Sequence, residues 1–359
     1  DMHNGREAGL SEAMLDRLQL DDHRIDAMID GVHRIAQLPD PVGESLESWQ
    51  HPNGMEITKT RVPLGVILII YESRPNVTAD AATLCFKSGN AVILRGGSEA
   101  VHTNTAIADA IQQALRVCDI DPDVNQLLTT TDREAVHELL RMPQYIDLVV
   151  PRGGEGLIRA VADHSAIPVL KHYKGVCHVY VDSDADLEMA RNIAVNAKCQ
   201  RPGVCNAMET LLVHRDVAQR FIPELGDMLR SAGVQIRGDE TTCSLLPDAQ
   251  PASEDDWREE YLNLTLAVRV VDDLNAAIDH VETYGSHHSD VIVTANETAA
   301  ERFCRDVDSA AVYVNASSRF TDGGEFNMGA EIGISTDKLH ARGPCGLREL
   351  TSYKYVIRG

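Results

Sequence analysis

From residue 65 onward the chain alternates continuous apolar stretches with amphipathic ones, and this alternation restricts the fold more than any other feature. The segments VILIIY, AVILR and IDLVV are apolar throughout, which predicts strands buried on both faces. Between them, apolar side chains recur every three to four residues, as in helices packed by one face. Buried strands joined by such helices are typical of a parallel sheet covered on both sides. We therefore predict an α/β fold that begins with a Rossmann-like domain.

The alternation restarts after VLKHYKGVCHVYVD and predicts a second α/β unit. A chain of 359 residues is long enough for two domains. We expect a dinucleotide-binding domain over residues 1–175, with a strand arm at about 55–64, and a catalytic domain over residues 176–342. Residues 343–359 are expected to be a C-terminal segment that returns to the first domain or joins subunits.

The composition excludes several classes of protein. Hydrophobic residues make up 43% of the chain and charged residues 25%, as in an ordinary globular protein. The longest apolar run, VPLGVILIIY, has the length of a strand rather than of a membrane span. A net charge of −22 argues against a nucleic-acid partner, because the phosphate backbone would be repelled. An anionic substrate would therefore need a locally basic pocket.

Eight cysteines are scattered along the chain, without a CxxC pair or a Cys/His cluster at zinc spacing, so we predict no metal site. The sequence has no pattern of a secretory leader. Together these features predict reduced thiols and a cytoplasmic protein. The chain begins with Asp1 rather than Met, which indicates that its start is trimmed.

Cys205 is the strongest candidate for a catalytic residue. It follows the bend Arg201-Pro202-Gly203, which ends the helical pattern DLEMARNIAVNAK, and it precedes the strand-like ETLLV. A thiol on such a bend can be held rigidly and still meet a substrate, and Arg201 could favour the reactive thiolate. The alternative is an ordinary small core residue, because free cysteines are often buried.

Three strand-to-helix corners could receive a nucleotide, although neither a GxGxxG nor a GxxxxGK[ST] fingerprint is present. RGGSEA (95–100) and PRGGEG (151–156) combine glycines with a helix start, whose free amides attract phosphate. YESRPN (71–76) ends the first strand at the edge of the sheet where ligands bind. Each corner alone is also explained as a tight turn. The polar segment that follows VNASSRF is either a solvated tail or a wall of a binding site.

The chain closely resembles the gamma-glutamyl phosphate reductases, also called glutamate-5-semialdehyde dehydrogenases, of the aldehyde dehydrogenase superfamily. The resemblance runs from about residue 5 to the C-terminus and rests on VPLGVILIIYESRPNVTADAA, KSGNAVILRGGSEA, VVPRGGEGL, KGVCHVYVD, QRPGVCNAMETLLVH, SHHSDVIVT and VNASSRFTDGGEFNMGAE. It implies an aldehyde dehydrogenase-like fold with a small oligomerisation arm. It also implies NADPH-dependent reduction of L-glutamyl 5-phosphate to L-glutamate 5-semialdehyde with release of phosphate, the second step of proline synthesis.

The resemblance assigns roles to individual residues. Cys205 would attack the acyl phosphate and form a thioacyl enzyme that accepts hydride. The Cys205 amide and Asn76, or Ser73 in its place, would stabilise the oxyanion. The residues implied for the cofactor are Arg95, Gly96, Gly97, Ser98, Pro151, Arg152, Gly153, Gly154 and Glu260, with Arg95 suited to the 2′-phosphate of NADP. The residues implied for the substrate are Arg74, His172, His288, Arg319, Thr321, Asp322 and Glu325, with Lys171 and His340 as further candidates for its phosphate.

One departure from the superfamily supports this interpretation. Hydrolytic relatives carry a glutamate in a Glu-Leu-Gly-Gly-Lys motif, whereas the matching segment here, VLKHYKG (169–175), has no acid. That difference fits a thioester that is reduced rather than hydrolysed. The resemblance further implies a homodimer or tetramer and names the upstream glutamate 5-kinase as a candidate partner. A coenzyme A-acylating or other aldehyde dehydrogenase, and a catalytically silent nucleotide-binding relative, stay open as alternatives.

Overall fold

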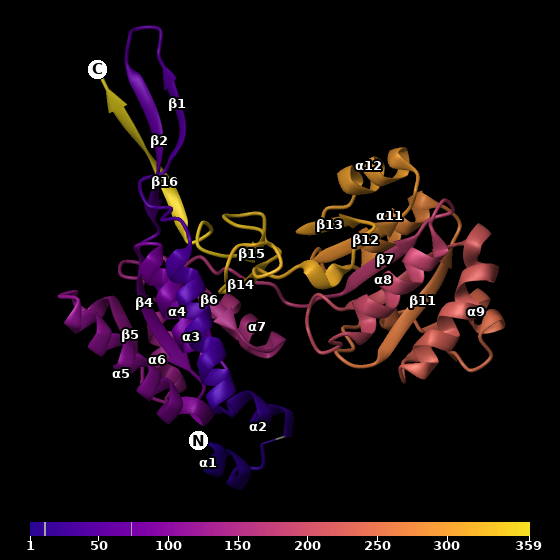
Figure 1. Cartoon of the computed structure of the whole chain (residues 1–359), viewed down its shortest axis with the longest axis horizontal. Coiled ribbons are helices and arrows are strands. Elements are labelled where there is room, and N and C mark those ends of the chain that lie inside the picture. The colour runs from indigo at the N-terminus through magenta and orange to yellow at the C-terminus, as the bar shows by residue number, and fades with distance from the viewer. Residues whose placement is uncertain (11, 73) are drawn as a thin grey trace. The chain divides into compact units, whose positions relative to one another are not determined.

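The chain folds into two compact units, which we describe separately. The computed structural model describes residues 1–10, 12–72 and 74–359; unit 1 is Asp1–Lys171 with Gly323–Gly359, and unit 2 is His172–Asp322 (Figure 1). These bounds differ from the expected ones, because residues 323–342 belong to unit 1 instead of the catalytic domain. The physical reason is packing, since Ile332 and Ala341 are buried in a hydrophobic cluster of unit 1.

Unit 1 is built on a four-stranded parallel sheet in the order β5-β4-β3-β6. Its strands are β3 (Val66–Tyr71), β4 (Ala91–Gly96), β5 (Asn125–Leu127) and β6 (Leu148–Arg152). The central strand β3 alternates between two cores: Ile67 and Ile69 belong to one hydrophobic cluster, Leu68 and Ile70 to another. This two-sided burial is why the segment VILIIY is apolar at every position.

Helices cover both faces of this sheet, and short helices precede it. In chain order they are α1 (Met2–Glu7), α2 (Glu12–Leu18), α3 (Asp22–Gln37), α4 (Pro75–Lys87), η1 (Ser98–Ala100), α5 (Val101–Val117), η2 (Pro122–Val124), α6 (Arg133–Leu139) and α7 (Glu155–His164). Helix α4 packs with one hydrophobic cluster, and α6 and α7 pack with the other. None of the helices in the described part of the chain is both long and apolar enough to cross a membrane.

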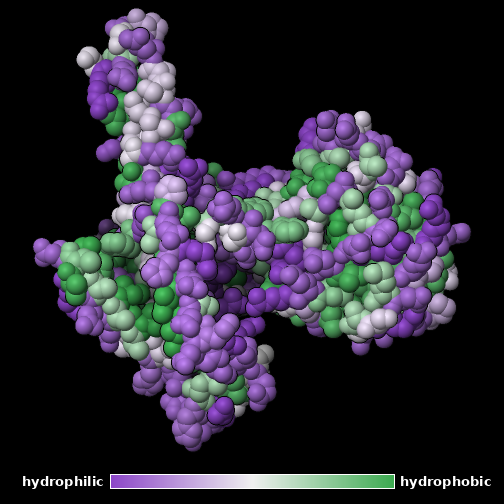
Figure 2. Space-filling model, viewed as in Figure 1, coloured by the Kyte–Doolittle hydropathy of each residue, from purple (hydrophilic) through white to green (hydrophobic). Residues whose placement is uncertain are grey.

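A separate antiparallel sheet, which we call the arm, projects from unit 1 (Figure 1). It consists of β1 (Ser45–Gln50), β2 (Glu56–Pro63) and the C-terminal β16 (Thr351–Arg358), with β2 in the middle. Hydrophilic and hydrophobic residues are interspersed on the face of the arm seen in Figure 2. Unit 1 also contains the antiparallel pair β14 (Gly333–Ser335) and β15 (Gly343–Cys345).

Unit 2 is a seven-stranded parallel sheet in the order β10-β9-β11-β8-β7-β12-β13. The strands are β7 (Cys177–Val181), β8 (Met208–His214), β9 (Gln235–Gly238), β10 (Gln250–Pro251), β11 (Thr265–Val271), β12 (Ser289–Val293) and β13 (Ala311–Val314). The helices are α8 (Leu187–Cys199), α9 (Arg215–Ser231), α10 (Glu240–Leu245), η3 (Asp255–Arg258), α11 (Leu274–Tyr284), α12 (Glu297–Asp306) and η4 (Ser318–Phe320). Helices α8 and α9 pack in one hydrophobic cluster, α11 and α12 in another. The predicted α/β fold with parallel sheets is confirmed.

Candidate active site

Cys205 lies in unit 2 on the bend between α8 and β8, and it is half-buried. Gly175 approaches it so closely that an added Cβ would stand 1.7 Å from the Cys205 carbonyl oxygen, which leaves room only for glycine. The same carbonyl accepts a hydrogen bond from the Cys177 thiol at 3.2 Å. Burial raises the pKa of Cys177 well above its usual range, and Cys205 is the more accessible thiol of the two.

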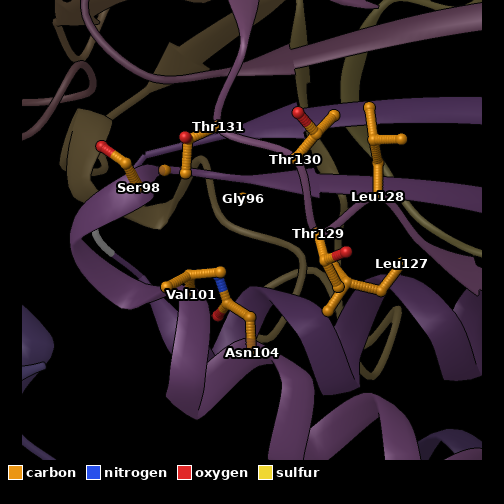
Figure 3. A pocket seen from close by; sticks show the side chains of 10 residues that line it. Gly96, Ser98, Val101, Asn104, Leu127, Leu128, Thr129, Thr130 and Thr131 are labelled. Carbon is orange, nitrogen blue, oxygen red and sulfur yellow. The ribbon is translucent and has the colours of Figure 1, made fainter.

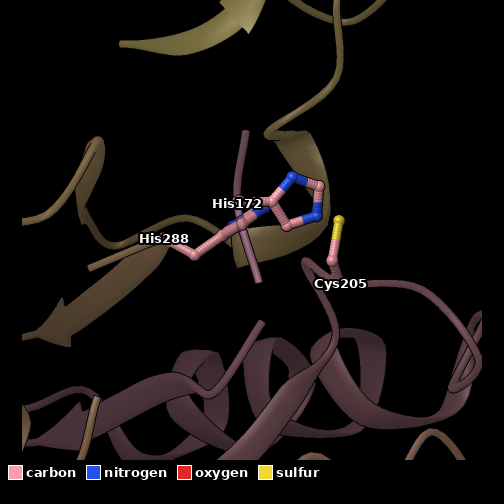
Figure 4. Close-up of side chains that lie close together, drawn as sticks. All are labelled: His172, Cys205 and His288. Atoms are coloured by element: carbon pink, nitrogen blue, oxygen red, sulfur yellow. The ribbon is translucent and has the colours of Figure 1, made fainter. Parts of the chain in front are cut away.

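Two histidines, His172 and His288, lie beside Cys205, although they are 33 and 83 positions away from it in the sequence. One ring nitrogen of His172, one of His288 and the Cys205 sulfur all lie within 4.8 Å of one another. The two imidazole rings meet edge to face with centroids 5.4 Å apart, and the Cys205 sulfur is directed toward them (Figure 4). His172 is half-buried in the loop before β7, and His288 is fully buried next to the start of β12.

His288 is a neutral group in this site. Burial, together with the neighbouring His172, lowers its pKa to about 3. Its Nδ1 lies 2.9 Å from the Ser289 hydroxyl, which in turn lies 2.6 Å from the Thr321 hydroxyl. Tyr313 completes this chain of hydroxyls at 2.8 Å from Thr321. His288 therefore offers a ligand a hydrogen bond rather than a positive charge, and fully buried Thr321 lies behind it in the hydrogen-bond chain.

Asn206, the residue after Cys205, fixes the bend against η4. Its Nδ2 donates to the Thr321 carbonyl oxygen at 2.8 Å, and its carbonyl oxygen accepts from the Ser318 hydroxyl at 2.7 Å. Arg319 donates from Nη1 to the Asn206 side-chain oxygen and from Nε to Gln200 Oε1 at 2.8 Å. The structure thus brings Arg319 and Thr321 to the Cys205 loop, as contacts that brace the loop.

A buried ion pair joins the two elements on either side of this bend. Lys198 on α8 donates to Glu209 on β8 at 2.5 Å, and both side chains are completely shielded from solvent. Burial raises the pKa of Glu209 to about 7 and lowers the pKa of Lys198. The Leu262 amide also donates to Glu209, at 3.2 Å. Sequence reasoning missed this pair because a lysine and a glutamate eleven residues apart carry no signal before α8 and β8 are paired in space.

The remaining candidates of unit 2 are Glu260 and Asp322. Glu260 accepts a hydrogen bond from the Gly175 amide at 2.7 Å, so it restrains the glycine that packs against Cys205. Asp322 is exposed at the end of the unit. Asn206, Ser289 and Cys177 were not predicted. For Asn206 and Ser289, their positions next to Cys205 in QRPGVCNAM and next to His288 in SHHSD could have drawn attention; Cys177 carried no such signal.

In unit 1, the corner after β4 forms a pocket. Arg95 is the next-to-last residue of the strand; its Nη1 donates to the Gly96 carbonyl at 3.1 Å, while its Nε is buried and has no hydrogen-bond partner. The pocket is lined by Gly96, Gly97, Ser98, Val101, Asn104, Leu127, Leu128, Thr129, Thr130 and Thr131 (Figure 3). A Cβ on Gly96 would lie 2.1 Å from Asn104 Nδ2, so the backbone can approach helix α5 only without a side chain. Serine and threonine hydroxyls line the pocket, with the Arg95 guanidinium next to it in the chain, and such donors suit a phosphate or ribose. The Glu99 carboxylate lies against Gly97, where its Oε1 would be 2.1 Å from an added Cβ.

The corner after β6 is already filled by a carboxylate. Gly154, at the start of α7, donates its amide to Glu72 Oε2 at 2.9 Å, and a Cβ on Gly153 would lie 2.4 Å from the same oxygen. Pro151 and Arg152 belong to β6 itself. The Gly154 amide of the corner predicted to attract phosphate therefore binds Glu72, and an anion there would require that side chain to move.

Other predicted residues of unit 1 are distributed around it. Arg74 and Asn76 lie exposed at the start of α4, where Asn76 Nδ2 donates to Asp80 at 3.1 Å. Lys171 forms an ion pair with Asp337 at 2.7 Å, Glu325 is exposed, and His340 Nε2 lies 2.8 Å from the Glu349 carbonyl oxygen. Ser73, the alternative oxyanion donor, lies outside the described residues. The roles predicted for this set stay predictions.

Comparison with known proteins shows which family this chain belongs to. Residues 16–245 match the model of the aldehyde dehydrogenase family. The chain is 56% identical over its whole length to a gamma-glutamyl phosphate reductase of Desulfatibacillum aliphaticivorans and 57% identical to one of Moorella thermoacetica, and it covers 86% of each. The crystal structure of the gamma-glutamyl phosphate reductase from Thermotoga maritima superposes with a TM-score of 0.98 at 50% identity, covering 100% of this chain and 86% of that one.

The chain therefore belongs to the aldehyde dehydrogenase family and, within it, to the gamma-glutamyl phosphate reductases. The predicted family is confirmed.

Proposed function

We propose that this protein reduces L-glutamyl 5-phosphate to L-glutamate 5-semialdehyde and releases phosphate, with NADPH as the reductant, in proline synthesis. The observation that carries the proposal is the half-buried Cys205 thiol beside two histidines, in a chain more than half identical to curated gamma-glutamyl phosphate reductases. An acyl phosphate is already activated toward nucleophiles, so a positioned thiolate is the main requirement for the first step.

In the proposed first step the Cys205 sulfur bonds to the acyl carbon, and the bond between that carbon and the phosphate oxygen breaks. Because burial lowers the pKa of His288 to about 3, this imidazole is a weak base, and we assign the uptake of the thiol proton to His172. The Cys205 amide is the donor proposed for the oxyanion, with Asn76 as its partner. NADPH, when bound, supplies the hydride that converts the thioester to the aldehyde. Release of the aldehyde returns the electron pair to the Cys205 sulfur.

The corner Arg95–Ser98 is the part of unit 1 that fits a cofactor phosphate, since the Arg95 Nε has no partner and a pocket lies beside it. Its charge suits the 2′-phosphate of NADPH. The resident Glu72 carboxylate makes Pro151–Gly154 a poorer phosphate site as it stands. For the substrate, Arg74 and the exposed acids Asp322 and Glu325 are proposed contacts for the phosphate or carboxylate and for the amine.

The reverse reaction tests this function directly. Wild-type protein should reduce NADP⁺ with glutamate semialdehyde only when inorganic phosphate is present, and coenzyme A should not replace phosphate. Cys205→Ala should abolish turnover while NADPH binding stays near that of the wild type, and Cys304→Ser, a change of an exposed thiol on α12, is the matched control. Substantial turnover by Cys205→Ala would contradict the nucleophile, and a coenzyme A-dependent rate would favour the acylating alternative. NADPH binding without turnover by the wild type would favour a silent relative.

We further propose a cytoplasmic homo-oligomer. Each of the eight cysteines, all within the described part of the chain, is a free thiol, which suits a reducing compartment. The labile acyl phosphate would also favour direct transfer from the kinase that makes it, which is why glutamate 5-kinase is retained as a candidate partner.

A further inference from the structure

His172, Cys205 and His288 form a group of potential metal ligands; the proposed reaction gives His172 a role as a base beside Cys205 but gives none to buried His288. Their nearest donor atoms lie within 4.8 Å of one another. The three residues come from the loop before β7, the bend before β8 and the start of β12, so the sheet of unit 2 assembles the group from distant parts of the sequence. All three belong to the same compact unit.

A second, independent observation points to a ligand. The Nε2 of His288 is buried and has no hydrogen-bond partner, although the side chain is fully shielded from solvent. Such an atom normally finds a partner, and each exception calls for an explanation. The other ring nitrogen, Nδ1, lies 2.9 Å from the Ser289 hydroxyl. If Nδ1 donates its proton to Ser289, the lone pair of Nε2 is left for a metal, the usual tautomer of a metal-binding histidine.

We propose that His172, Cys205 and His288 bind a zinc-like divalent cation, which blocks the catalytic thiol reversibly. A site of one thiolate and two imidazoles binds zinc in preference to magnesium or calcium. Metal–ligand bonds of about 2.0–2.3 Å place neighbouring donors of a tetrahedral site about 3.3–3.6 Å apart. A small inward movement is therefore enough, and His172 lies in a loop without regular secondary structure and can supply it.

Binding releases the Cys205 proton to solvent and leaves the fourth position of the metal to water. The metal and an acyl group cannot share the one sulfur. The cation should therefore compete with the acyl substrate, a consequence that rests on the proposed function, whereas the metal site itself does not.

Two measurements on the full chain test the site without relying on turnover. Co²⁺ titrated into metal-free protein should produce a sulfur-to-cobalt absorption band that saturates at one ion per chain. Saturating Zn²⁺ should slow iodoacetamide labelling of Cys205, followed by peptide mass mapping, by more than about tenfold, and EDTA should restore the rate. Labelling of exposed Cys304 is the internal control.

Variants identify the ligands. Cys205→Ser should lose the band, and His172→Ala should weaken Co²⁺ binding by more than about tenfold, whereas His102→Ala on α5 of unit 1 should leave it unchanged. Because His288 is fully buried, the effect of His288→Gln on Co²⁺ binding is interpreted only if the variant melts at the same temperature as the wild type. The test does not depend on this variant, because His172→Ala and the labelling of the wild type decide it. The site is refuted if Zn²⁺ leaves Cys205 labelling unchanged or the band survives in Cys205→Ser. A site that binds Co²⁺ in a protein without reductase activity would overturn the proposed function alone.

Discussion

The backbone of Cys205 packs directly against a glycine, Gly175. The Gly175 amide is held by Glu260 at 2.7 Å. Around the thiol, Asn206 ties the bend to η4, and His172 and His288 stand beside the sulfur. These contacts surround the bend on which the sulfur lies, and a displacement of about 1 Å at a reacting atom can cost an enzyme about 10²-fold in rate.

Gly175→Ala is expected to displace Cys205, because the new methyl group would overlap its carbonyl oxygen. Turnover should fall by about 10²-fold while unit 2 stays folded by circular dichroism. Gly203→Ala is the matched control on the same loop, since its Cβ would make only an ordinary contact of 3.6 Å with the Leu262 carbonyl oxygen. Equal effects of the two changes would mean that the close approach of Gly175 does not position the thiol.

At the scale of the elements, strand ends and helix starts decide where chemistry can occur. The bend that carries Cys205 is anchored at both ends by the ion pair between α8 and β8. The corner from β4 to η1 opens a pocket, whereas the corner from β6 to α7 is closed by Glu72. Two corners with nearly the same sequence pattern, RGGSEA and PRGGEG, each hold a carboxylate against a glycine, but from different places: Glu99 of the same corner lies against Gly97, whereas Glu72 comes from another segment and accepts the Gly154 amide.

Lys198→Met should destabilise unit 2 by about 3–5 kcal/mol, because Glu209 would be left buried without its partner. Urea denaturation measures the loss as a lower midpoint. The double change Lys198→Met with Glu209→Leu should recover most of it, since no unpaired charge remains. Arg230→Ala, which removes an exposed pair with Asp248, should leave the urea midpoint nearly unchanged. A double variant no more stable than Lys198→Met would show that the pair does more than neutralise two buried charges.

Arg95→Ala should weaken NADPH binding by about tenfold or more and NADH binding much less, because only NADPH carries a 2′-phosphate for the guanidinium. Fluorescence titration of the two reduced cofactors gives both dissociation constants. Arg116→Ala, at the far end of α5, should leave both unchanged. Equal losses for the two cofactors after the Arg95 change would remove this residue from 2′-phosphate recognition.

For the whole molecule, the arm is the feature that suggests assembly. Its outer strands are β1 and β16, whose free edges are a template for pairing with another chain. Tyr353, Tyr355 and Ile357 alternate along β16 and so lie on one face, and each is about half exposed, at 48%, 53% and 59%. Trp49 of β1 packs edge to face with Tyr355 on that side. An apolar face of this kind is costly in water and favours a second copy of the chain.

Tyr355→Lys combined with Ile357→Lys should convert the proposed oligomer to a smaller species, because the charges would oppose burial of the arm. Light scattering after size-exclusion chromatography measures the mass. Val117→Lys is the control, since Val117 is 81% exposed at the end of α5. A wild-type mass equal to one chain, or an unchanged mass in the double variant, would contradict assembly through this face.

Much of the architecture could be predicted because it depends on short stretches of sequence. Apolar runs such as VILIIY have the period of doubly buried strands, and Arg201-Pro202-Gly203 marks the bend before Cys205. Both features depend on residues that are neighbours along the chain, so a single sequence contains the information. The predicted arm near residues 55–64 corresponds to β2 for the same reason.

The sequence by itself determined the parallel sheets, the bend that carries Cys205 and the glycine-rich corners, because period and turn chemistry act over a few residues. Only the tertiary structure decided that residues 323–342 join unit 1, that Glu72 fills the corner after β6, and that His172 and His288 stand beside Cys205. These facts follow from strand order and packing, which bring distant segments together. A contact between distant residues depends on how the sheet is assembled, and no short stretch of sequence encodes it.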